Sequence, residues 1–248
     1  MTNKTAALLI IGNEILSGRT QDKNLNYIAN KLNDIGIKFA EARVVLDIHE
    51  DISHAVNELR TKYDYLFTTG GIGPTHDDIT TESVAAAFNL PVIRNEYAQK
   101  LLEDYYKDRD AELNEARLRM ANTPEGAELI ENPLTAAPGY KIDNVFVLAG
   151  IPNIMKMMFD YASQYLEGGS KMFSASVSCD LVEGDIAEKL SEIQQKYNNT
   201  EIGSYPFIKD GKYSVSAVVR SIDEKTVEVV AEEIREFILQ KGGAIIEK

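Results

Sequence analysis

The segment TTGGIGPTHDD combines glycines that suit an anionic ligand with aspartates that repel one. Gly70, Gly71 and Gly73 allow the backbone to adopt positive φ angles, so that its N–H groups can approach a phosphate or a ring carbonyl. Asp77 and Asp78 follow within a few residues, although a carboxylate repels a phosphate. Both can serve one ligand if a divalent cation lies between them, because hard cations take oxygen ligands from carboxylates and phosphates alike.

The aspartate pair also has a structural interpretation. Asp77 or Asp78 can cap a helix that is predicted to begin near Ile79, and we expect one of them to do so. Two adjacent aspartates are more than a cap needs, which favours a functional role for the other. The loop fits neither the P-loop, since no Gly-Lys-Ser/Thr follows, nor the dinucleotide fingerprint, since no glycine lies three residues after Gly73. The pattern alone predicts a loop for phosphate or a small ligand with an acidic partner.

Further polar residues occur in and after the segment GNEILSG and in the loop itself. Glu14 could supply a third carboxylate. His76 could be a further metal ligand, although a single histidine in a polar loop is more often simply exposed. Asn13, Ser17 and Asn24 are candidates to hydrogen-bond a ring or a ribose. Their structural alternatives, a turn former for Asn13 and helix caps for the other two, stay open.

The elements that must position these residues alternate between apolar β-type runs and amphipathic helices. Strands are predicted over residues 6–12, 39–46 and 63–71, and helices over 24–36, 50–62 and 80–90. Alternation with short connections predicts a doubly wound parallel sheet. Ligands bind outside the carboxyl ends of such strands, near the point where the strand order reverses. We therefore expect GNEILSG, TTGGIGPTHDD and LAGIPN to converge on one pocket.

The following segment, residues 91–120, is charged and is predicted to form a solvated helix or a pair of helices. Its Tyr105 and Tyr106 could form a partner surface, but half-buried packing is the better interpretation. Residues 127–150 are predicted to form two strands around a turn at Pro138-Gly139, before a helix that starts near Pro152.

Beyond the Gly-rich segment LEGGSK the predicted order is strand, helix, strand, strand, helix, with an Asp-Gly hairpin turn. This order predicts a small α+β domain with two helices on one face of a three-stranded sheet. We therefore divide the chain into a larger α/β domain, residues 1–168, and a smaller domain, residues 169–248.

Composition excludes several classes of partner. The 248 residues carry a formal net charge of -13, with 39 Asp and Glu against 26 Lys and Arg. This balance argues against a nucleic-acid binder and against adhesion to an anionic membrane. Cys179 is the single cysteine, which fits a reducing cytosol, and it is better interpreted as a small buried strand residue than as a nucleophile. The apolar run Ala6–Ile11 is too short to span a membrane, and we expect a cytoplasmic protein without a signal peptide.

The combination of TTGGIGPTHDDIT with the upstream IIGNEILSGRTQDKN resembles the molybdopterin-binding fold family of MoaB/Mog-like proteins. The resemblance is closer to the branch at the N-terminus of CinA-like (competence/damage-inducible) proteins and of eukaryotic FAD synthases. It continues through ANTPEGAELIENPLTAAPGY, FVLAGIPNIM and EIGSYPFI. It implies a three-layer α/β/α fold that binds molybdopterin or nucleotides at the three loops. It also implies metal-dependent hydrolysis of a pyrophosphate link, as in ADP-ribose for the CinA-like branch or FAD for the other.

The resemblance completes the predicted site. The expected ligand-binding residues are Gly12, Asn13, Glu14, Ser17, Asn24, Thr69, Gly70, Gly71, Gly73, Thr75, Gly150 and Pro152. Asp77 and Asp78 are expected to be catalytic and, together with Glu14, to hold a divalent cation (Mg, Mn or Co). The expected partner is a small nucleotide or a pterin such as molybdopterin, and we expect a homo-oligomer.

The sequence departs from the family pattern at four positions. Asn13 stands where an aspartate is usual, Lys23 where a threonine is common, Ala149 where proline is usual, and Ile154 where the CinA-like branch often has glutamate. With two acidic positions lost, three functions stay open: a hydrolase, a module that binds without turnover, and a partner protein that has lost the chemistry. Deamidation of nicotinamide mononucleotide is not expected, because no deamidase domain follows Lys248.

Overall fold

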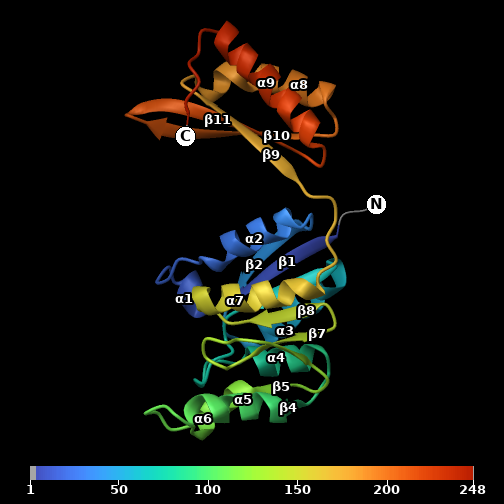
Figure 1. The fold of residues 1–248 in the computed structure, drawn as a ribbon, viewed down its shortest axis with the longest axis vertical. Helices are drawn as coiled ribbons and strands as arrows, with labels where there is room; N and C mark the ends of the chain where they lie inside the picture. Colours follow the sequence, from blue (N-terminus) through green and yellow to red (C-terminus); the bar gives the residue numbers. More distant parts are fainter. Residues whose placement is uncertain (1–3, 248) are drawn as a thin grey trace. The chain divides into compact units, whose positions relative to one another are not determined.

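The structure is a computed structural model that describes residues 4–247 (Figure 1). The chain divides into two compact units, the first ending at Gly169 and the second beginning at Ser170. Each unit has its own sheet and its own hydrophobic core. Within residues 4–247, none of the helices combines the length and the apolar character needed to cross a membrane.

A six-stranded sheet with the strand order β2-β1-β3-β8-β7-β6 forms the centre of the first unit. The strands are β1 (Thr5–Ile11), β2 (Lys38–Val45), β3 (Tyr65–Thr69), β6 (Glu128–Ile130), β7 (Gly139–Ile142) and β8 (Val145–Leu148). β2, β1, β3 and β8 are mutually parallel, whereas β7 runs antiparallel to both of its neighbours. The predicted, mostly parallel sheet is therefore confirmed.

Helices cover both faces of this sheet, which gives three layers (Figure 1). Alternate residues of β1 point into two different cores, because successive side chains of a strand point to opposite faces. Leu8 and Ile10 pack with residues of α2 (Asn24–Asp34) and α7 (Pro152–Ala162). Leu9 and Ile11 pack with residues of α3 (His49–Lys62) and α4 (Thr80–Ala87). Burial on both faces explains why β1 is a continuous apolar run.

The order β2-β1-β3 places the reversal of strand order at β1. The chain leaves β1 for β2 on one side and returns to β3 on the other side. The loops that follow β1 and β3 therefore diverge at the carboxyl edge of the sheet, where open α/β sheets bind ligands. The loop after β1 begins with the short helix α1 (Asn13–Leu16).

Residues 91–124 differ from the expected helical segment. β4 (Val92–Arg94) pairs in antiparallel fashion with β5 (Asn122–Pro124). Between these strands lie α5 (Glu96–Tyr106), α6 (Glu115–Leu118) and the 3-10 helix η1 (Arg119–Ala121). The prediction of helices alone was wrong at the start of the segment, because three residues are too few to show the alternation of a strand.

The prediction for residues 127–150 was also wrong in part. Three strands are present rather than two, and Gly139 is the first residue of β7, not part of a turn. A Cβ atom on Gly139 would lie 2.4 Å from the carbonyl oxygen of Val147 in β8. The glycine therefore permits a close approach of two strands. The tight turn between β7 and β8 contains Asp143 instead, whose φ is 52°.

The second unit has the predicted order of elements. They are β9 (Phe173–Cys179), α8 (Glu183–Lys196), β10 (Glu201–Lys209), β11 (Lys212–Ser221) and α9 (Glu224–Gln240). The sheet order is β10-β11-β9, all antiparallel, and the inward residues of both helices pack in one core with β9 and β11. The Asp-Gly hairpin turn is confirmed, with φ angles of 51° at Asp210 and 76° at Gly211. Cys179 is buried, as expected, and burial raises the pKa of its thiol.

Candidate functional site

A cavity of about 710 Å³ lies at the carboxyl ends of β1, β3 and β8. The three loops that were predicted to converge all contribute to it. The predicted site residues that line it are Gly12, Glu14, Gly70, Gly71, Gly73, Asp77, Asp78, Gly150 and Pro152. The structure thus brings together in space residues that are up to 140 positions apart in the chain, as the difference between Gly12 and Pro152 shows.

A smaller recess of about 70 Å³ shares residues with this cavity and contains Asn24 and Thr69. The side-chain amide of Asn24 donates to the carbonyl of Gly150 (2.8 Å) and so connects α2 to the loop after β8. Asn24 Oδ1 and Thr69 Oγ1 are buried and have no hydrogen-bond partner within residues 4–247. Asn24 does not have the helix-capping role considered for it, because the N-cap of α2 is Lys23; the N–H of Leu25 in the first turn donates to Asp22 Oδ1 (2.8 Å).

Three other predicted residues, Asn13, Ser17 and Thr75, belong to the loops but do not line the large cavity. Asn13 is held by a reciprocal pair of hydrogen bonds. Its N–H donates to Asp47 Oδ2 (2.8 Å), and its Oδ1 accepts from the N–H of Asp47 (3.3 Å). Asp47, which follows β2, itself lines the cavity. The loop after β2 therefore places a carboxylate beside Asn13.

The glycine loop is shaped by close contacts within the protein. Gly70 has a φ of 104°, and a Cβ atom there would lie 2.2 Å from the carbonyl oxygen of Ile11. Gly71 has a φ of 66°, and a Cβ atom there would lie 2.2 Å from Thr80 Oγ1. The Thr80 hydroxyl in turn donates to the Gly70 carbonyl (2.9 Å). Both glycines are therefore needed to fold the loop between β1 and α4.

Three consecutive backbone N–H groups of this loop have no hydrogen-bond acceptor among residues 4–247. The N–H groups of Gly71, Ile72 and Gly73 donate no hydrogen bond to any of residues 4–247. All three residues line the cavity. Successive free N–H groups around a residue of positive φ form a concavity suited to an anion.

The two aspartates differ in their contacts, and neither caps α4. The N-cap of α4 is Ile79, without a side-chain cap, so the expected capping role was wrong. Asp78 Oδ2 instead accepts the N–H (2.8 Å) and the hydroxyl of Thr75, closing a turn within the loop. Asp77 is exposed, and the Thr75 hydroxyl, followed by the backbone N–H of Asp77 itself, lowers the pKa of its carboxyl.

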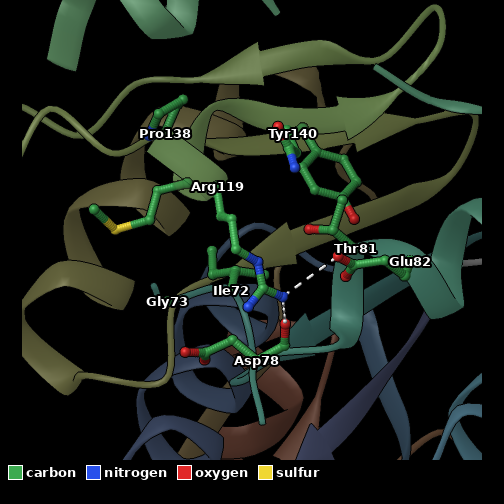
Figure 2. Close-up of a pocket in the computed structure, with 10 residues that line it drawn as sticks. Ile72, Gly73, Asp78, Thr81, Glu82, Arg119, Pro138 and Tyr140 are labelled. Carbon is green, nitrogen blue, oxygen red and sulfur yellow. Dashed lines mark hydrogen bonds and ion pairs between the residues drawn. The ribbon is translucent and has the colours of Figure 1, made fainter. Parts of the chain in front are cut away.

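Arg119 supports the same turn from a distant segment and was not identified from the sequence. Figure 2 shows its guanidinium reaching from η1 towards Asp78 and Glu82. It donates to the carbonyls of Thr75 (2.8 Å) and Asp78 (3.1 Å) and lies 3.4 Å from a carboxylate oxygen of Glu82. One planar cation therefore joins the loop, the start of α4 and η1. An arginine 41 residues beyond Asp78 carries no local pattern that would have revealed this role.

The charged side chains that line the cavity are all acidic. Four carboxylate residues line it, namely Glu14, Asp47, Asp77 and Asp78, and no lysine, arginine or histidine of residues 4–247 is among the lining residues. Nor does this described part of the chain gather three or more His, Cys, Asp or Glu side chains closely enough to hold a metal. The donors present still suit Mg²⁺, which commonly uses one or two carboxylates together with the phosphates of a substrate.

Much of the rest of the cavity wall is apolar. Its apolar lining includes Met120, Ile151, Ile154, Met158 and the aromatic pair of α5, Tyr105 and Tyr106. Ile154, one of the departures from the expected family pattern, is thus a wall residue. Ala149 also lines the cavity.

Comparison with known proteins gives consistent matches. Residues 7–167 match the family described as probable molybdopterin binding domain, and residues 171–243 match the family described as FAD synthase, middle domain. A probable FAD synthase of Caenorhabditis elegans is 31% identical over 95% of this chain and 50% of its own length. A CinA-like protein of Kosmotoga olearia is 30% identical over 97% of this chain and 60% of its own length.

The chain thus spans only 50% and 60% of the length of these two relatives. Among solved structures, the protein CinA of Thermoplasma acidophilum, described as having unknown function, aligns with a TM-score of 0.60 and 32% identity. That alignment covers 66% of this chain and 97% of the other.

Proposed function

The chain belongs to the family of probable molybdopterin binding domains, and we propose that its large cavity binds a nucleotide or pterin and, with a divalent cation, hydrolyses a pyrophosphate link. The favoured substrates are nucleotides of the ADP-ribose or FAD type. One observation carries the proposal. The cavity combines three free backbone N–H groups with four carboxylates and no lining lysine or arginine of the described chain. A phosphate can enter such a site only with a cation that offsets the carboxylates.

The residues of the chain take separate roles in this proposal. The N–H groups of Gly71, Ile72 and Gly73 bind phosphate oxygens and stabilise the negative charge that grows on them during hydrolysis. Asp77 and Asp78 would hold the cation together with phosphate oxygens of the ligand. Glu14 was expected as a third ligand, but no three such side chains of residues 4–247 lie close enough to share a metal ion. The Asp77 carboxyl, whose pKa is lowered from 3.8, is ionised at neutral pH and can take part in holding the cation. When bound, the cation supplies positive charge and Lewis acidity at the phosphoryl group.

A hydrolysis panel tests the proposal. ADP-ribose, FAD and NAD are each incubated with Mg²⁺, Mn²⁺ or Co²⁺, with and without a chelator. We expect turnover of at least one substrate that requires the cation and falls by about 100-fold or more in Asp77→Asn, in keeping with the effect of removing one electrostatic catalytic group. Asp34→Asn, an exposed change at the end of α2, should leave turnover unchanged. Turnover that persists in the chelator would refute the proposed chemistry.

Binding without turnover is the second candidate function. It is favoured by the lack of a three-residue metal cluster within residues 4–247 and by the engagement of Asp78 Oδ2 with Thr75. This candidate predicts that calorimetry detects a nucleotide or pterin binding to the wild type, that Asp77→Asn still binds it in part, and that no substrate is hydrolysed. If no ligand binds and none is hydrolysed, a partner protein that has lost the chemistry is the surviving alternative. A cytoplasmic location and a homo-oligomeric state stay predictions.

A further inference from the structure

We propose that Tyr105 is the stacking residue for the planar ring of the ligand and that it selects nucleotides over ringless phosphates. The proposal rests on the proposed function, because it assigns the place of the ring within the same cavity. Tyr105 and Tyr106 form the last turn of α5, and both line the cavity that the glycine loop and the aspartates also line.

The two tyrosines hold each other in a fixed arrangement. Their ring centroids are 5.2 Å apart and their planes lie at 81°, an edge-to-face geometry. The guanidinium of Arg109 lies 3.9 Å from the centroid of Tyr105, and that of Arg117 lies 4.9 Å from the centroid of Tyr106. Because Arg109 occupies one face of the Tyr105 ring, a ligand ring would stack on the other face.

Packing explains Tyr106 but not Tyr105. Tyr106 continues the buried stripe of α5 and packs against the small core of Ala98, Leu102 and Ala121. Tyr105 is half-buried yet belongs to none of the hydrophobic cores found within residues 4–247. An aromatic ring on a cavity wall without a core of its own is available for a ligand.

The chemical character of the residues that line the cavity favours a place for the ring beside α5. The lining carboxylates and the unpaired N–H groups come from the loops after β1, β2 and β3, where the proposed function puts the phosphates and the cation, whereas Tyr105 and Met120 come from α5 and η1. Ile151, which is 62% exposed, also lines the cavity, from the loop after β8, and adds to its apolar surface. A volume of about 710 Å³ is far more than a pyrophosphate group fills and lies within the range for ligands of drug size.

This assignment defines a substrate class. Stacking recognises the face of a ring rather than its edge, so adenine, flavin and pterin rings should all be accepted. Ringless inorganic pyrophosphate should bind through the loop alone. The site is then expected to discriminate by the presence of a ring more than by its identity.

Calorimetric titration of the full chain, with Ca²⁺ as the cation, tests the proposal. ADP-ribose, FAD and inorganic pyrophosphate are titrated into wild type, Tyr105→Ala and Tyr105→Phe. We expect Tyr105→Ala to raise the Kd of ADP-ribose and FAD by about 5- to 150-fold, the range for loss of one stacking partner, with the Kd of pyrophosphate unchanged within about twofold. Tyr105→Phe should bind like wild type. Tyr97→Ala, a matched control on the exposed side of the same helix, should also bind like wild type.

The possible outcomes separate this proposal from the proposed function. If wild type binds the ring ligands and Tyr105→Ala binds them equally well, or loses pyrophosphate to the same degree, the stacking role is wrong and the proposed function stands. If wild type binds none of the three ligands, both proposals fail. Should Tyr105→Ala unfold, Tyr105→Leu preserves apolar volume without a ring, and it must show the same selective loss.

Discussion

Asp77 and Asp78 are adjacent in the chain, but their carboxylates make different contacts. Asp78 closes the turn with Thr75, whereas Asp77 is exposed on the cavity wall. Asp78→Ala should therefore lower the free energy of unfolding by about 1 kcal/mol, the usual worth of such hydrogen bonds, and also weaken ligand binding. Asp77→Ala should weaken cation-dependent binding while changing stability by less than about 0.5 kcal/mol. Urea unfolding and calorimetry on both variants check this division, and equal losses of stability would contradict it.

Glu41 is the centre of an ion-pair network on β2 and should make stability depend on pH. Lys62, Tyr63 and Arg43, in that order of importance, lower the pKa of its carboxyl from 4.5 to about 2. A carboxyl whose pKa is lower in the folded state stabilises the fold fully above its unfolded pKa, and this stabilisation is lost as the pH falls through the folded pKa. The loss should thus occur between about pH 4.5 and pH 2.

Glu41→Gln removes this dependence. Since the side chain is 23% exposed and solvent screens the pairs, the expected loss at pH 7 is only about 1 kcal/mol. The difference between wild type and variant should shrink towards pH 2.5. Urea unfolding at pH 7, 4 and 2.5 measures it, and a difference that stays constant with pH would show that Glu41 is not the titrating group.

At the scale of elements, the loop after β3 requires glycine at position 70 for two reasons: the positive φ and the lack of space for a Cβ atom. Gly70→Ala would have to accept both a positive φ and an overlap with the Ile11 carbonyl at 2.2 Å. We expect this variant to lose more than about 3 kcal/mol or fail to fold, because backbone atoms cannot move aside cheaply. Gly126 is the matched control, since its φ is 80° but no atom lies within 4 Å of an added Cβ. Gly126→Ala should cost only about 1 kcal/mol by thermal unfolding. If both variants lost a similar amount of stability, the positive φ alone would account for the cost and the contact with Ile11 would not matter.

Arg119 connects two elements that no local sequence pattern relates. A lysine can reach only one of the carbonyls of Thr75 and Asp78 that the planar guanidinium joins. Arg119→Lys should therefore loosen the loop. We expect the Kd of cation-dependent ligand binding to rise by about tenfold and the free energy of unfolding to fall by about 1 kcal/mol. Arg235→Lys on α9, whose ion pair is exposed, is the control and should change neither. Unchanged ligand affinity in Arg119→Lys would show that the loop holds its shape unaided.

How far the sequence predicts these elements depends on the range of the contacts that fix them. The apolar run of β1 and the glycines after β3 are local patterns, and they correctly predict the parallel sheet and the segments that meet in one cavity. Gly139 was assigned to a turn because its real constraint, the carbonyl of Val147, lies on the next strand. Asp77 or Asp78 was expected to cap α4, because the competing partner of Asp78, Thr75, becomes available only once the turn has closed. Such contacts follow from the folded backbone and leave no periodic trace in the sequence.

At the scale of the whole molecule, binding and stability are divided between two units. The candidate site is built entirely from residues before Gly169, whereas the second unit has a separate core of β9, β11, α8 and α9. The second unit also matches a different family, the FAD synthase middle domain. A ligand of the cavity should therefore stabilise the first unit directly.

Differential scanning calorimetry of the full chain can resolve this division, because separate cores permit separate unfolding transitions. At a ligand concentration about 100 times the Kd, binding stabilises the first unit by about 2.7 kcal/mol. For a unit of this size the shift in Tm should be about 5 to 10 °C, and the transition of the second unit should not move. Calorimetry of residues 170–248 alone identifies which transition belongs to the second unit. If ADP-ribose or FAD, added with Mn²⁺, moved both transitions by the same amount, the units would unfold as one and the stability of the second unit would be coupled to the site.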